Sequence, residues 1–316
     1  MNELKKIKLN RFDLIYVSSA LPDTMIEKYF NNSYQFFPHQ SQKYNRLLIE
    51  GLTKNGIRVN ALSILPITRN ITRKIIIDKN NTYQNKVLYS TMRLINIPII
   101  KNLTIFFSIL FILIKNNKET PVVIDLLNKT ATIAVYIAKK VKKNYVIGLL
   151  TDIPSFNTDK YNDNLQLTKL QKKIFSSFDH FILLTNEMTK LHKKFENNHT
   201  IIEGICDETL EVTYLNKYEG CSCLYSGTLA KVYGIDNLIQ AFMSKDLEKV
   251  NLYIYGEGDY REEIERVSLS HKNIIYKGSV SNKEIIIEQT KVNLLINPRP
   301  VEGMFTKYSF PSKIIE

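Results

Sequence analysis

The fold prediction for the second half of the chain starts from the stretch Ser222-Cys-Leu-Tyr-Ser-Gly227-Thr228, followed closely by Gly234-Ile-Asp-Asn-Leu-Ile-Gln-Ala-Phe242. Its first part is typical of a short buried strand that ends at a glycine turn, and its second part has the apolar spacing of an amphipathic helix. The same order recurs where residues 250–255 run into Gly256-Glu-Gly258, and another strand is expected at 273–276. We therefore predict a βαβ domain with a parallel sheet.

The first half of the chain repeats this alternation of strands and helices. Residues 12–17 form a branched, apolar run of the kind buried in parallel sheets, and a helix is expected over 42–54 before a strand at 58–64. Further strands are predicted at 121–125, 145–150 and 180–184, and further helices at 130–142 and 165–175. The pattern predicts a doubly wound α/β domain over residues 1–206 and a second, shorter one over residues 207–316.

Polar residues gather where the strands of the first half are expected to end. They are Ser18-Ser19, Asp125, Thr151-Asp152 and Thr185-Asn-Glu187. Doubly wound sheets bind ligands at the carboxyl ends of their strands, so we expect these side chains to lie at the binding edge.

Three predicted strand ends in the second half turn on glycine: Gly227, Gly256 with Gly258, and Gly278. Glycine permits positive φ and lets a ligand approach backbone amides, as at phosphate and nucleotide sites, although each glycine could also serve only the turn. The dinucleotide pattern G-x-G-x-x-G is not met, and no P-loop pattern occurs.

Composition limits which classes of binding partner and which cellular compartment are expected for the protein. The chain has 316 residues with 43 Lys and Arg against 31 Asp and Glu, a net charge of +12, which suits nucleic acid, an anionic membrane surface or phosphate-bearing ligands. The lysines are scattered and no aromatic-basic motif occurs, so a nucleic-acid partner is not expected. Three cysteines and a polar N-terminus indicate a reducing cytosol. Cys221-Ser-Cys223 lacks the partner cluster of a zinc site.

The longest apolar run covers residues 103–114, between Lys101 and Lys115. It is shorter than the roughly 20 residues that a spanning helix needs. A buried core helix is the favoured interpretation, an interfacial helix comes second and a true span third. Nearby cations such as Arg93 and Lys118 would suit an anionic membrane surface.

The ordered motifs resemble the family 4 retaining glycosyltransferases of the GT-B fold, of the bacterial capsular and exopolysaccharide type. In the second half these motifs are the opening stretch extended to Leu224–Phe242, then Tyr255-Gly-Glu-Gly258, Gly278-Ser-Val280, Asn297-Pro-Arg299 and Phe310-Pro-Ser-Lys-Ile-Ile-Glu316. In the first half they are Leu150-Thr-Asp152-Ile-Pro154, Leu183-Leu-Thr185-Asn-Glu-Met188 and Ile202-Glu-Gly204 with Asp207. The resemblance implies two Rossmann-like domains that face a cleft, the second of them incomplete.

The resemblance also implies a donor site in the second domain. Glu316 would grip the nucleotide ribose, and the helix opened by Pro311-Ser312 would turn its free amides toward the diphosphate. Lys231, Arg299 and Lys313 are the expected phosphate cations, and Gly278, Ser279 and Val280 the base-binding loop. The remaining donor-binding candidates are Gly227, Thr228, Gly256 and Gly258.

The same resemblance implies transfer of a sugar from a nucleotide diphosphate sugar to a lipid-linked or polysaccharide acceptor, with retention of configuration. Such a reaction needs stabilisation of the leaving diphosphate and no protein nucleophile. No cofactor is expected, and the absence of a D-x-D motif agrees with a metal-independent enzyme. Asp152 and His39 are the catalytic candidates near the transferred sugar. The expected location is the cytoplasm, peripheral on the inner face of the cell membrane.

Two alternatives stay open. One is a GT-B sugar-nucleotide epimerase, which acts on the donor without an acceptor. The other is a catalytically silent nucleotide-binding subunit, because Thr228, Tyr233 and Tyr308 stand where the family commonly carries Arg, Lys and Glu. The chain also stops at Glu316, after the fourth predicted strand of the second domain, so we expect it to be a fragment.

Overall fold

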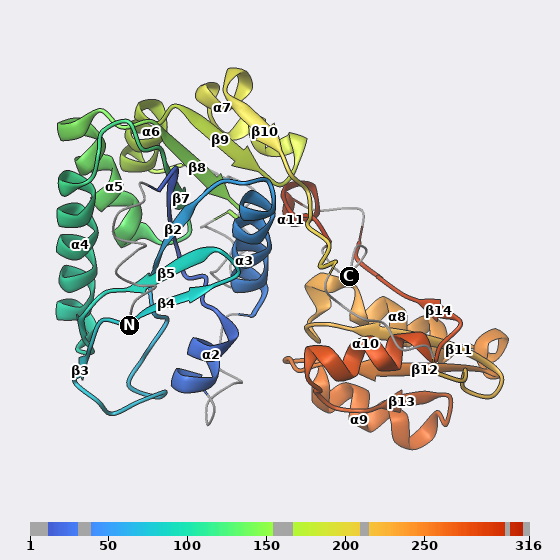
Figure 1. Cartoon of the computed structure of the whole chain (residues 1–316). Helices are drawn as coiled ribbons and strands as arrows, with labels where there is room; N and C mark the ends of the chain where they lie inside the picture. Colours follow the sequence, from blue (N-terminus) through green and yellow to red (C-terminus); the bar gives the residue numbers. More distant parts are fainter. Residues whose placement is uncertain (1–11, 31–38, 154–166, 209–214, 301–303, 312–316) are drawn as a thin grey trace. The chain divides into compact units, whose positions relative to one another are not determined.

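The computed structural model describes residues 12–30, 39–153, 167–208, 215–300 and 304–311 of the chain (Figure 1). The chain divides into two compact units. Unit 1 comprises Met1–Cys206 and Lys307–Phe310, and unit 2 comprises Asp207–Thr306 and Pro311–Glu316. Assignment of the short segment Lys307–Phe310 to unit 1 was not part of the sequence prediction. Within that unit the Oγ1 atom of Thr185 donates a hydrogen bond to the carbonyl oxygen of Lys307 at 3.1 Å, and Tyr308 is buried.

Unit 1 contains an eight-stranded sheet in the order β10-β9-β8-β7-β1-β2-β5-β4. Its strands are β1 (Leu14–Ser18), β2 (Val59–Ser63), β4 (Asn81–Gln84), β5 (Val87–Thr91), β7 (Val122–Asp125), β8 (Val146–Leu150), β9 (His180–Leu183) and β10 (His199–Ile201). Neighbouring strands are parallel except β4 and β5, which pair antiparallel at the edge. Two further strands, β3 (Ile76–Ile77) and β6 (Leu94–Ile95), pair antiparallel with each other.

Helices cover both faces of this sheet, with α2 and α3 on one face and α4 and α5 on the other (Figure 1). The helical elements of unit 1 are α2 (Asp23–Phe30), α3 (His39–Lys54), α4 (Pro98–Lys115), α5 (Lys129–Lys142), α6 (Lys169–Ser177), the 3₁₀ helix η2 (Asn186–Leu191) and α7 (Lys193–Asn197). A further short helix, α11, covers Met304–Tyr308.

Local sequence explains where the helices of unit 1 begin and end. The side chain of Asn128 caps α5 by accepting a hydrogen bond from the amide of Ala131, and the helix ends at Lys143 in the left-handed conformation (φ 57°). Thr168 and Gln171 form a capping box at the start of α6. The helix predicted over residues 130–142 corresponds to α5, Lys129–Lys142, and is confirmed to within one residue.

One hydrophobic core cluster of unit 1 lies between the central strands and the helices α2 and α3. It joins Tyr16 and Ala61 of β1 and β2 to Ile49 of α3 and Met25 of α2, all of them 0–1% exposed. Every residue of β1 and β7 is buried, as expected for strands with helices on both faces.

Unit 2 is a smaller sheet of four parallel strands in the order β13-β12-β11-β14. The strands are β11 (Cys221–Ser226), β12 (Val250–Tyr255), β13 (Ile274–Tyr276) and β14 (Leu294–Leu295). The helical elements are the 3₁₀ helices η3 (Lys231–Tyr233) and η4 (Lys245–Leu247), and α8 (Ile235–Phe242), α9 (Arg261–Ser270) and α10 (Asn282–Thr290). Apolar side chains of α8 and α9 pack on one face of the sheet, and Ile285 of α10 packs on the other.

Both sheets have the topology of a doubly wound fold, so this prediction is confirmed. Chain order runs outward from β1 through β2 to β5 in one direction and from β7 through β8 to β10 in the other. In unit 2 it runs from β11 to β13, and then restarts on the other side of β11 with β14. The order therefore reverses between β1 and β7 and between β11 and β14. These two switch points are where such folds bind ligands.

Candidate functional site

The candidate donor site of unit 2 consists of the loops at the carboxyl ends of its strands. Two backbone hydrogen bonds join the loop after β11 to the loop after β12. The amide of Gly227 donates to the carbonyl oxygen of Tyr255 at 3.0 Å, and the amide of Leu229 donates to that of Glu257 at 2.9 Å. These two amides are therefore engaged within the protein.

Three glycines of this edge allow backbone to approach backbone. A Cβ atom at Gly256, where φ is +139°, would lie 1.8 Å from the carbonyl oxygen of Gly227. One at Gly258 would lie 2.3 Å from the carbonyl oxygen of Leu229. One at Gly234, where φ is +79°, would lie 2.1 Å from the carbonyl oxygen of Pro298. Glycine is required at these positions by contact between loops, whether or not a ligand is bound.

Two tyrosine hydroxyls brace the same loops. Tyr225, at the end of β11, donates to the carbonyl oxygen of Thr228 at 2.8 Å, and Tyr276, at the end of β13, donates to that of Gly256 at 2.9 Å. Burial raises the pKa of Tyr225 to about 12. The sequence reasoning missed both tyrosines, although each occupies the last position of a predicted strand, 222–225 or 273–276.

The loop after β13 holds the predicted base-binding residues. Gly278 has φ of +76° and accepts a hydrogen bond from the amide of Gly256 at 2.9 Å. Ser279 and Val280 are exposed, and they directly precede Ser281, which caps α10. This loop is therefore joined to the glycine loops and presents two exposed residues beside them.

Two of the predicted phosphate cations lie on the loops after β11 and β14. Lys231 is exposed on η3, and its Nζ atom lies 5.6 Å from the ring centre of Tyr260. Arg299 follows β14, and its guanidinium carbon lies 5.9 Å from the ring centre of Tyr233. The contact between Gly234 and Pro298 brings the loops that carry these two cations together.

The remaining donor candidates lie at the end of the chain. Pro311 is described and half-buried. Ser312, Lys313 and Glu316 lie outside the described residues, so their predicted roles stay predictions.

The switch point of unit 1 holds a buried polar chain. The Tyr16 hydroxyl of β1 donates to Oδ1 of Asn45 at 2.8 Å, and Nδ2 of Asn45 donates to Oδ2 of Asp125 at 3.0 Å. The other carboxyl oxygen of Asp125 accepts from the amide of Leu127 at 3.0 Å. Burial raises the pKa of Asp125, and these two hydrogen bonds oppose the shift. The sequence indicated Asp125 but missed Asn45, a polar residue on the buried face of a predicted helix.

The two catalytic candidates belong to unit 1. Asp152 is half-buried two residues after the end of β8, and its Oδ1 atom accepts a hydrogen bond from the amide of Ile153 at 2.7 Å. His39 is the first residue of α3, and its side chain is outside the part that the structure describes.

Among the described residues, His, Cys, Asp and Glu form no group of three that could hold a metal ion. Of the three cysteines, Cys206 and Cys221 are exposed and Cys223 is buried in β11, and all three are free thiols.

No model of a known protein family matches the chain, and no curated protein matches it. Solved structures do. The apo form of the lipopolysaccharide outer core galactosyltransferase WaaB aligns with a TM-score of 0.56 and 11% identity, over 95% of this chain and 76% of that one. The catalytic domain of starch synthase IV from Arabidopsis thaliana, bound to ADP and acarbose, aligns with a TM-score of 0.60 and 8% identity, over 93% of this chain and 79% of that one. Anabaena HepE in complex with UDP aligns with a TM-score of 0.54 and 10% identity, over 92% of this chain and 75% of that one.

These alignments extend over both units and rest on shared topology, because the identities are near the level of unrelated sequences. Similarity of this kind shows fold and leaves function to the site. The chain has the GT-B fold, with two Rossmann-like units.

Proposed function

We propose that the protein is a glycosyltransferase that uses a nucleotide diphosphate sugar, with unit 2 as the donor-binding domain. The observation that carries the proposal is the edge of the unit 2 sheet at the carboxyl ends of its strands. There, the glycine loops after β11 and β12 are in backbone contact, and the loops after β11 and β14 carry Lys231 and Arg299. A strand-end edge with cations is suited to a diphosphate, whose negative charge increases as the sugar leaves.

The finer assignment rests on the resemblance to family 4 enzymes. In the proposed reaction an acceptor hydroxyl attacks the anomeric carbon on the face that the nucleotide leaves, and the bond between that carbon and the β-phosphate oxygen breaks. The acceptor proton passes to a β-phosphate oxygen, so nucleoside diphosphate is released and configuration is retained. Asp152 and His39 of unit 1 would contact the transferred sugar, Glu316 would hold the ribose, and a lipid-linked or polysaccharide chain would be the acceptor.

The structures of relatives in fold support this choice of donor class. HepE was solved with UDP and starch synthase IV with ADP, so both bases belong in a donor screen. The test incubates the full chain with UDP-, ADP- and GDP-linked hexoses, with and without a pooled lipid-linked acceptor fraction, and measures released nucleoside diphosphate. We expect acceptor-dependent release from one donor, and a loss of about tenfold or more on Glu316→Ala.

Three outcomes would contradict the proposal. Interconversion of the sugar with donor alone would make the protein an epimerase. Nucleotide binding without release under any condition would make it a silent subunit. Failure to bind any of the nucleotides would remove the donor site altogether. A matched control is Lys249→Ala, because Lys249 is exposed at the amino end of β12, at the edge of the sheet opposite the glycine loops.

A further inference from the structure

Helix α4 carries an apolar stripe on its outer face. Six large apolar side chains are exposed along it: Ile99 (77%), Ile100 (39%), Leu103 (51%), Phe107 (60%), Phe111 (59%) and Ile114 (36%). Their spacing of three or four residues places them on one side of the helix. The sequence interpretation that favoured a core helix is therefore wrong for this face.

The opposite face of α4 is part of the protein interior. Ile105, Ile109 and Leu113 are at most 4% exposed, and the helix packs on α5 and β6. By length and composition, α4 is the one helix in the described ranges that could cross a membrane. To span a bilayer it would have to leave α5 and uncover the apolar surface that it protects. Its packing favours a helix that lies flat with the stripe outward.

The stripe continues onto the neighbouring strand pair. Ile75 and Ile76 are 51% and 49% exposed. Ile76 pairs with Ile95 of β6, and the carbonyl oxygen of Ile75 accepts from the amide of Asn96 at 2.6 Å, two residues before α4 begins. The apolar surface therefore extends past the amino end of the helix.

The segment that carries this surface is rich in basic residues. Residues 69–119 contain nine Lys or Arg and two acidic residues, Asp78 and Glu119. The Nζ atom of Lys115 lies 4.1 Å from the ring centre of Phe111, so one cation contacts an aromatic ring of the stripe. Asp78 is 3.6 Å from Arg93 and offsets one of the nine positive charges.

We propose that the outer face of α4, extended by Ile75 and Ile76, docks the protein on the surface of an anionic lipid bilayer. Aliphatic and phenyl side chains would enter the boundary between headgroups and acyl chains, while Lys115 and its neighbours would bind the anionic headgroups. A second copy of the chain would bring two positively charged segments together, which disfavours a dimer through this face.

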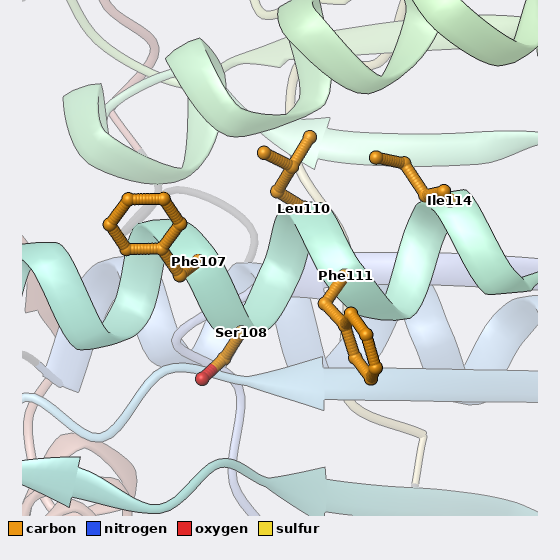
Figure 2. Close-up of a pocket in the computed structure, with 5 residues that line it drawn as sticks. All are labelled: Phe107, Ser108, Leu110, Phe111 and Ile114. Atoms are coloured by element: carbon orange, nitrogen blue, oxygen red, sulfur yellow. The ribbon is translucent and has the colours of Figure 1, made fainter.

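A small ligand fits this face poorly. The hollow on it is lined by Phe107, Ser108, Leu110, Phe111 and Ile114, all from α4 alone, as Figure 2 shows. A hollow with walls from one helix cannot enclose a ligand as binding pockets do. The docking inference does not depend on the proposed transferase activity and can be tested without it.

The test is co-sedimentation of the full chain with vesicles of phosphatidylcholine alone and of phosphatidylcholine mixed with phosphatidylglycerol. We expect binding to the mixed vesicles, weakened by salt, and a loss of about tenfold or more for the double variant Phe107→Ser/Phe111→Ser. The control is Leu269→Ser, which removes an 83% exposed apolar side chain from α9 of unit 2. This control should bind as the unmodified chain does.

A second variant separates charge from apolar contact. Lys115→Glu/Lys118→Glu should lose binding to the mixed vesicles while its circular dichroism stays unchanged, because both side chains are exposed. Equal binding by all variants, or an equal loss by Leu269→Ser, would overturn the proposal. Light scattering without lipid gives the other contrary result: a dimer that becomes a monomer in the Phe107/Phe111 variant would identify a second copy as the occupant.

Discussion

The Oδ2 atom of Asp125 accepts a hydrogen bond from the Nδ2 atom of Asn45 at 3.0 Å, and both side chains are nearly or fully buried. The contact joins the carboxyl end of β7 to α3 across the switch point of unit 1. Asn45 in turn accepts from the hydroxyl of Tyr16 on β1. One amide side chain thus fixes the helix against the two strands between which the chain order reverses.

Stability of unit 1 should depend on pH through Asp125. Burial raises its pKa in the folded state, so its contribution is fully present below the unfolded pKa of about 3.9 and is lost as pH rises through the folded pKa. Asp125→Asn should remove this dependence and cost about 1 kcal/mol at low pH, because Asn45 and Leu127 donate to separate carboxyl oxygens and an asparagine has only one side-chain oxygen. Hydrogen exchange of unit 1 peptides, measured from pH 4 to 8 in urea, gives the pH dependence of stability for the unmodified chain and the variant. A variant with an unchanged pH slope would contradict the argument.

Unit 2 should show the opposite pH dependence at Glu288. Burial alone would raise the pKa of Glu288, but hydrogen bonds from Lys291, Tyr218 and Tyr255 together lower it. Its contribution is therefore present above the unfolded pKa and is lost as pH falls through the folded pKa. Glu288→Gln should cost about 2 kcal/mol at neutral pH and less in acid. Hydrogen exchange of unit 2 peptides measures this change in stability. If the stability lost on Glu288→Gln grew as the pH fell, the prediction would be wrong.

The glycine loops predict a difference between two alanine substitutions. Gly256→Ala should destabilise unit 2 by about 3 kcal/mol or more, because the new Cβ atom would overlap the carbonyl oxygen of Gly227. Gly278→Ala should cost only about 1–2 kcal/mol, since φ is also positive there but no atom lies within 4 Å of the Cβ position. Urea denaturation followed by circular dichroism compares them. Equal losses would mean that φ, and not contact between loops, sets the requirement.

Binding of nucleoside diphosphate should depend on salt through Lys231 and Arg299. Lys231→Ala and Arg299→Ala should each raise the Kd for UDP or ADP by about tenfold and reduce its salt dependence. Lys249→Ala, which removes the same charge at the opposite edge of the sheet, should leave both unchanged. Isothermal titration calorimetry at two ionic strengths measures this. If Lys249→Ala weakened binding equally, net charge and not position would be responsible.

Much of the fold followed from local patterns. Buried strands such as β1 and β12 could be predicted from apolar runs that end at small residues. Helix α5 could be predicted from its apolar periodicity and its Asn128 cap. The edge strand β4 was not indicated, because its residues alternate between exposed and half-buried and give no apolar face. Of the candidate site, the glycines and cations of unit 2 could be named from motifs. Asn45, Tyr225 and Tyr276 could not, since their partners are distant in sequence or are backbone atoms.

Local sequence patterns were sufficient to predict the two doubly wound units, because strand and helix periodicity act over a few residues and right-handed crossovers leave little choice of topology. The side of each apolar element that packs against protein became evident only from the folded chain. In α4 the run of apolar residues is nearly continuous, so composition could not separate the buried row of Ile105, Ile109 and Leu113 from the exposed row of Phe107 and Phe111. That distinction depends on where α5 and β6 lie, and their position is fixed by contacts between segments distant in sequence.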